Sequence, residues 1–250
     1  MSASEAGPSS TSPAEGAESS RGKIQRRQQL ERIVREGSLD IDLYLELAAL
    51  HRAEDRPLEA RRILQQALQL SKDDPRVLWE FEEATLARSL QQVREVADLA
   101  ARLNTPEVDR EMKRAQTDWA NRRLEVCRAR LHRDPTQIHL RLVIAEALYD
   151  LGMFKEAAEE ALPCLETDGT SPAAHLIRGR CLLDMGQDLD ALAEFRAVAM
   201  RRAVPGPAKM RLIAMRRAVE IAQRNHLTLS VERYRHAMEA AEHDLTKEAG

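Results

Sequence analysis

Histidine and cysteine are the residue types in this sequence that most often act as metal ligands, bases or nucleophiles. The chain has seven histidines and no C-x-x-C or H-E-x-x-H motif. His132 and His139 lie on either side of Asp134-Pro135, a break between two helical segments. We therefore expect surface histidines, no metal site and no cofactor. We expect reduced thiols at the three widely spaced cysteines, which are Cys127, Cys164 and Cys181.

Paired carboxylates could perform acid and base catalysis, but the pairs in this chain have the wrong spacing. Glu82-Glu83 and Glu159-Glu160 are adjacent within helical segments, so their side chains point apart and favour a solvated face. No glycine-rich phosphate loop of the G-x-x-x-x-G-K or G-x-G-x-x-G type occurs. We therefore predict a protein that is not an enzyme and has no catalytic residues.

Arginine pairs could bind nucleic acid. They are Arg26-Arg27, Arg61-Arg62, Arg122-Arg123, Arg201-Arg202 and Arg216-Arg217. Acidic residues interrupt most of these clusters, and 38 Lys and Arg against 41 Asp and Glu give a net charge of −3. No aromatic stacking platform accompanies the arginines. Solvated arginines are therefore the favoured interpretation, and nucleic-acid binding through arginine-rich faces remains an alternative.

The elements that would position these residues are helices. Hydrophobic residues make up 43% of the chain and aromatic residues only 3%, so the core must consist mainly of aliphatic residues and alanine. Such a composition favours packed helices over strands and predicts an all-α fold. Residues 1–22 are rich in Ser, Ala, Gly, Pro and Glu, which predicts a disordered tail before a repeat domain over residues 23–250. Neither a signal peptide nor a membrane-length apolar run is present, so we expect a cytoplasmic protein with no membrane partner.

A period of 34 residues organises part of the chain. Gly186 follows Gly152 by 34 residues, and Gly179 follows Ala145 by the same interval. Each of these stretches has a helix with a small residue midway, a glycine turn, and a second helix that starts near an alanine. We expect the turn glycines to adopt a left-handed conformation, which ends the first helix at little steric cost.

This period and this distribution of small residues resemble the tetratricopeptide repeat, in which antiparallel helix hairpins stack into a solenoid. Further copies are expected over residues 42–74 and 209–242, with Asn225 at the turn of the last, and residues 24–36 are expected to form a cap. Pro163 should kink or end its helix. The matching positions of the two central copies are Ile144, Ala145, Leu148, Gly152, Phe154, Ala157, Cys164, Gly179, Leu182, Gly186, Ala191, Phe195 and Val198.

The middle of the chain is interpreted as a departure from this period. One long helix is predicted over residues 76–103 and another over residues 106–133. Thr105 is expected to cap the second of these helices and Pro106 to be its first residue. We expect a hairpin insertion over about residues 76–133 that packs like a short coiled coil. Self-association through this hairpin, with Trp119 and Val126 in the interface, is one variant of the predicted function.

The resemblance implies a scaffold or adaptor that binds a peptide or helix of a partner protein in a concave groove. In that family the first helix of every hairpin lines the groove, and Ala49 is among the matching positions. The resemblance does not identify the partner, and a regulatory subunit of a separate enzyme remains an alternative. The partner-binding residues that it implies are Leu45, Arg52, Leu142, Glu146, Tyr149, Leu176, Arg180 and Leu183.

Overall fold

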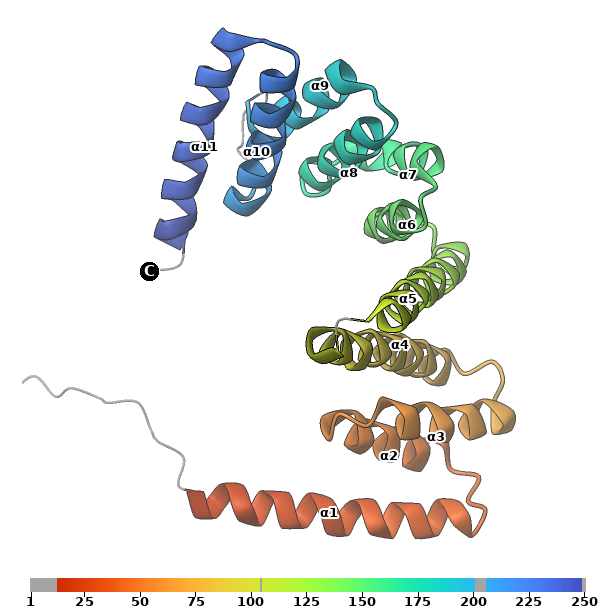
Figure 1. Ribbon diagram of the computed structural model, residues 1–250. Coiled ribbons are helices and arrows are strands. Elements are labelled where there is room, and N and C mark those ends of the chain that lie inside the picture. Colours follow the sequence, from red (N-terminus) through yellow and green to blue (C-terminus); the bar gives the residue numbers. More distant parts are fainter. Residues whose placement is uncertain (1–12, 104, 201–205, 249–250) are drawn as a thin grey trace, which may run out of the picture. The chain divides into compact units, whose positions relative to one another are not determined.

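A computed structural model describes residues 13–103, 105–200 and 206–248, and within them it contains helices and no strand (Figure 1). None of these helices is long and apolar enough to cross a membrane. The helices are α1 (Pro13–Arg35), α2 (Ile41–Ala53), α3 (Pro57–Leu70), α4 (Pro75–Leu103), α5 (Pro106–Arg133), α6 (His139–Asp150), α7 (Phe154–Glu160), the 3-10 helix η1 (Leu162–Leu165), α8 (Ser171–Asp184), α9 (Asp188–Ala199), α10 (Ala208–Arg224) and α11 (Thr228–Glu248).

Two compact units divide the chain within α4, between Gln92 and Val93. In the first unit, Ala48 of α2, Leu64 of α3 and Ala84 of α4 pack in one buried cluster. The second unit has two cores. One joins α5 to α8, and the other joins α9, α10 and α11. The predicted all-α architecture of packed antiparallel helix hairpins is therefore confirmed.

The turns α2–α3, α6–α7, α8–α9 and α10–α11 each have one residue in the left-handed region. Gly152 and Gly186 have φ angles of 77° and 76°, which confirms the predicted role of these glycines. Asp55 takes the corresponding place between α2 and α3 with φ 54°. Between α10 and α11 that residue is His226, with φ 56°, whereas Asn225 caps α10 with φ −95°. The turn of the last copy therefore lies one residue later than predicted.

The proline and cap signals gave accurate helix boundaries. α7 ends at Glu160, and Pro163 lies in η1, so the early end expected from this proline is confirmed. The Thr105 hydroxyl accepts a hydrogen bond from the Val108 amide at 3.4 Å, and Pro106 is the first residue of α5. Proline fits there because the first turn of a helix does not use its amide hydrogens.

Two features differ from the sequence expectations. α1 begins at Pro13, so it includes residues 13–22 of the segment expected to be a tail, and residues 1–12 lie outside the described residues. Alanine and glutamate in this stretch favour a helix. In addition, Val77 and Ala84 at the beginning of α4 are fully buried in the first unit. This part of α4 therefore belongs to a repeat core. The coiled-coil-like hairpin and the single domain over residues 23–250 remain predictions.

Candidate functional site

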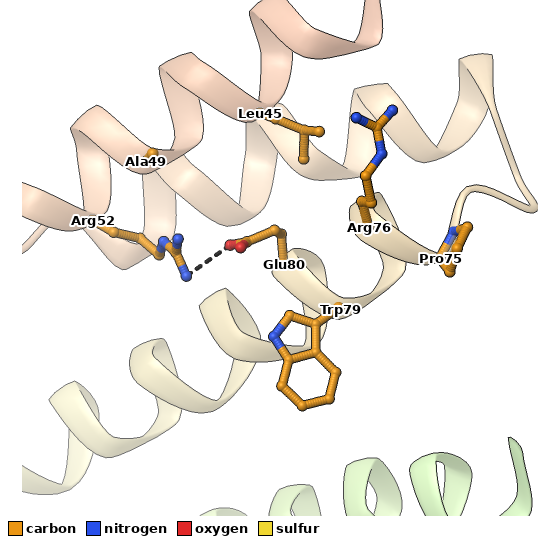
Figure 2. Close-up of a pocket in the computed structure, with 7 residues that line it drawn as sticks. All are labelled: Leu45, Ala49, Arg52, Pro75, Arg76, Trp79 and Glu80. Atoms are coloured by element: carbon orange, nitrogen blue, oxygen red, sulfur yellow. Dashed lines mark ion pairs between the residues drawn. The ribbon is translucent and has the colours of Figure 1, made fainter. Parts of the chain in front are cut away.

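A hollow of about 540 Å³ lies between α2 and α4 in the first unit (Figure 2). Leu45, Ala49 and Trp79 are among its apolar lining residues, and 45% of the Trp79 surface is exposed. A large, exposed aromatic surface in a concave apolar site is typical of binding sites. We call this site the α2–α4 groove, and its full lining is Leu45, Ala49, Arg52, Pro75, Arg76, Trp79 and Glu80.

The local sequence explains why these side chains face one another. Asp40 caps α2 by accepting a hydrogen bond from the Asp42 amide at 3.0 Å, and Asp74 accepts one from the Arg76 amide at 2.9 Å beside the first turn of α4. Asp42 and Arg76 are 34 residues apart and form an ion pair at 2.9 Å. The two helices therefore begin in register, and Trp79 of α4 occupies the position that Leu45 has in α2.

Charged residues surround the apolar lining as ion pairs. The Arg52 guanidinium lies 2.7 Å from the Glu80 carboxylate, as Figure 2 shows. Arg76 binds Asp42 and also Asp74, at 2.9 Å in each case, and its hydrogen bonds hold the pKa of Asp74 below the ordinary value. Asp74 therefore stays ionised near neutral pH, and the charges around the groove are arranged as ion pairs. The accessible surface of the groove is therefore mainly apolar, and ion pairs surround it.

The predicted residues of the second unit lie on two contacting helices, α6 and α8. Arg180 lies over the ring of Tyr149, 4.0 Å from its centroid, and the Tyr149 hydroxyl donates a hydrogen bond to the Asp184 carboxylate at 2.5 Å. Burial and this hydrogen bond raise the pKa of Tyr149, so the phenol keeps its proton at neutral pH. We call this surface the α6–α8 face.

Glu146 lies one turn before Tyr149 on α6. Half of its side chain is exposed, and its carboxylate lies 3.8 Å from Arg123 of α5. Neighbouring side chains partly withdraw the carboxyl from water, which raises the pKa of Glu146, while the charge of Arg123 opposes this change. Arg123 also pairs with Asp150 and lies over the ring of Trp119. Arg123 thus links the carboxylates of Glu146 and Asp150 in one charged network.

The structure brings some predicted site residues together and separates others. Leu45 and Arg52 line the α2–α4 groove, and Tyr149 contacts Arg180. The three remaining leucines are partly buried against two different cores of the second unit: Leu142 packs on the α5–α8 core, and Leu176 and Leu183 pack on the α9–α11 core. Their packing role is therefore substantial, and only part of each side chain is accessible.

Sequence reasoning missed the α4 side of the groove, which consists of Pro75, Arg76, Trp79 and Glu80. The signal was present, because the interval from Leu45 to Trp79 is the same 34 residues as the interval between the turn glycines. The length of α4, 29 residues, led to the interpretation of the whole helix as part of an insertion. Its first turns instead continue the repeat.

Most of the described arginine pairs are occupied by acidic partners. Arg26 binds Glu46 through two hydrogen bonds of 2.6 Å, and Arg217 binds Glu220 at 2.7 Å. Arg122 pairs with Glu125 at 2.6 Å. Arg201 and Arg202 lie outside the described residues. These ion pairs reduce the positive charge available to a phosphate backbone, which is the main source of affinity for nucleic acids.

The histidines and cysteines have mainly structural surroundings. His132 and His139 are exposed as expected, but His51 is buried with 3% of its surface accessible, because α1 and the α2–α3 turn cover it. The expectation of surface histidines is therefore wrong at His51. Cys127, Cys164 and Cys181 are buried in the α5–α8 core and form no disulfide, and burial raises the pKa of Cys181 to about 11. A thiol with this pKa stays protonated near neutral pH.

No protein-family model matches the sequence. No curated protein matches it either. Among solved structures, the chain is similar to YrrB, described as a TPR protein with an unusual peptide-binding site, with 16% sequence identity and a TM-score of 0.49. The similarity covers 86% of this chain and 93% of that one. The repeat architecture described above rests on the hairpins and the 34-residue period of this chain itself.

Proposed function

We propose that this protein is a non-enzymatic interaction scaffold or adaptor, and that a peptide or helix of a partner protein binds in the α2–α4 groove. The observation that carries the proposal is the apolar hollow of about 540 Å³ between two helices, with Trp79 as its exposed aromatic side chain. Aromatic residues in such positions contribute strongly to protein interfaces. The paired charges around the hollow would favour correct alignment of a partner.

The three buried cysteines, none of which is in a disulfide, support the proposed location of the protein in a reducing compartment such as the cytoplasm. In the hairpin variant of self-association, Val126 does not supply contact surface, because it is 6% exposed. Trp119, which is partly exposed, is the better residue with which to examine that variant.

Affinity capture from a lysate of the source organism tests the proposal. The bait would be wild-type protein or a Leu45→Arg, Ala49→Arg variant, which places two cations in the apolar groove. Gln65→Arg is the matched control, because Gln65 is exposed on α3 and lies outside the groove. We expect a specific protein to be lost with the groove variant and retained with the control. Identical captured proteins from all three baits would contradict the proposal.

A further inference from the structure

Tyr149 holds two side chains of α8 in fixed positions on the α6–α8 face. Its ring lies under the Arg180 guanidinium at 4.0 Å, and its hydroxyl binds the Asp184 carboxylate at 2.5 Å. Stacking on a ring orients a guanidinium and leaves its edge N–H groups available for other acceptors. Tyr149 therefore presents a cation and an anion that are four residues apart on one helix.

Arg180 and Asp184 can each bind a charged group of another molecule. Among the described residues, Arg180 forms no ion pair with a carboxylate and Asp184 forms none with a cation. Two charged neighbours interact with them, Glu146 with Arg180 and Arg217 with Asp184, and Arg217 already pairs with Glu220 at 2.7 Å. Glu146 lies beside Arg123 at 3.8 Å. A guanidinium has five N–H donors and a carboxylate about four acceptor sites, so both groups can accept another partner.

Apolar surface lies beside the two charges. Leu176 precedes Arg180 by one helical turn, Leu183 follows it by nearly one turn, and both are partly exposed. Leu176 and Asp184 are each four residues from Arg180, and Leu183 is three residues from it, so apolar and charged side chains share one side of α8. A second helix packed along α8 would present its own side chains at the same intervals, about 5–6 Å apart.

We propose that the α6–α8 face binds a partner α-helix that carries one acidic and one basic side chain a turn apart, the acidic one against Arg180 and the basic one against Asp184. Apolar residues of the same helix would cover Leu176 and Leu183. Opposite charges at this spacing also stabilise the partner helix itself, which favours a helix over an extended segment. This inference rests on the proposed function only in that the partner is a protein.

Four helical peptides with a fluorescent label would serve as probes, and the full-length protein would be titrated into each while fluorescence anisotropy is measured. All four would carry the same row of leucines along one face. They would carry Glu and Lys, Gln and Gln, Glu and Glu, or Lys and Lys at positions one turn apart. We expect wild-type protein to bind the Glu and Lys peptide about threefold to tenfold more tightly than the other three, as two exposed ion pairs allow.

Charge reversal on the protein should change this preference in a defined way. Arg180→Glu should make the Lys and Lys peptide the best ligand, and Asp184→Lys should favour the Glu and Glu peptide. Arg216→Gln, which removes an exposed arginine that pairs with Glu242 of α11, is the control and should leave the order unchanged. Circular dichroism would verify the fold of each variant.

Equal affinity for all four peptides, or no binding of any, would overturn the proposal. Binding that is lost with Leu45→Arg and retained with Arg180→Glu would also overturn it, because the contact would then lie in the α2–α4 groove. In each of these cases the proposed function is still judged separately by the capture experiment on the groove.

Discussion

At the scale of single residues, small side chains decide how closely the helices approach. Gly179 lies in the middle of α8, where a Cβ atom would lie 2.7 Å from the ring of Phe195 on α9. Phe195 is fully buried in the α9–α11 core. The sequence period identified Gly179 as a repeat position, but only the structure shows which side chain occupies the space that its missing Cβ leaves.

The substitution Gly179→Ala therefore tests packing against helix propensity, because the two effects change the free energy of unfolding in opposite directions. Alanine is favoured over glycine in a helix by about 1 kcal/mol, whereas an overpacked core costs about 1–3 kcal/mol. We expect a net decrease of about 1 kcal/mol in the free energy of unfolding, measured by urea denaturation. Gly22→Ala in α1 is the control, since nothing lies within 4 Å of the added Cβ, and it should not destabilise. Stabilisation by Gly179→Ala would contradict the packing described.

His51 should make stability depend on pH. Burial and the nearby charges of Arg56 and Arg27 lower its pKa below the ordinary 6.5, despite Glu31 and Glu54. The folded state disfavours the protonated ring of His51. The contribution of the neutral ring to the free energy of unfolding is therefore complete above about pH 6.5, and it is lost as the pH falls towards the lowered pKa. We expect a smaller loss of stability between about pH 7.5 and 5.5 for His51→Gln than for wild type, by chemical denaturation. Equal losses would contradict this account.

At the scale of elements, helix boundaries were the most predictable feature. Proline at the start of α5 and a positive φ at Gly152 and Gly186 are local properties, determined by sterics within a few residues. The turn at His226 was missed by one residue because neither Asn225 nor His226 has the unambiguous preference of glycine. The beginning of α1 was missed because composition alone does not distinguish a polar helix from a disordered segment.

The packing of α1 on the first unit includes one fully buried leucine and the partly buried Val34. Leu30 is fully buried, while Ile24, one and a half turns earlier, is 44% exposed. We expect Leu30→Ala to lower the free energy of unfolding by about 2–4 kcal/mol, because it leaves a cavity beneath α1. Ile24→Ala should cost less than about 1 kcal/mol. Similar small effects of both substitutions, by thermal or urea denaturation, would show that α1 does not contribute to the core.

At the scale of the whole molecule, the repeat pattern predicted the kind of architecture and only half of the candidate site. The α2 side of the groove followed from the first copy of the repeat. The α4 side was missed because a long helix can begin in a repeat core and continue beyond it, as Val77 and Ala84 show. The contact of Arg180 with Tyr149 joins two copies of the repeat, so it could not be derived from either copy alone.

The measurement that tests the central claim most directly is the fluorescence of Trp79 during titration with peptides. The chain has two tryptophans, so a Trp119→Phe variant reports from the α2–α4 groove alone. The peptides would first be selected from a random library by binding to wild-type protein. We expect a blue shift of the Trp79 emission on binding and loss of affinity with Leu45→Arg. Peptides that bind without changing the Trp79 emission, and equally well to Leu45→Arg, would contradict a binding site in this groove.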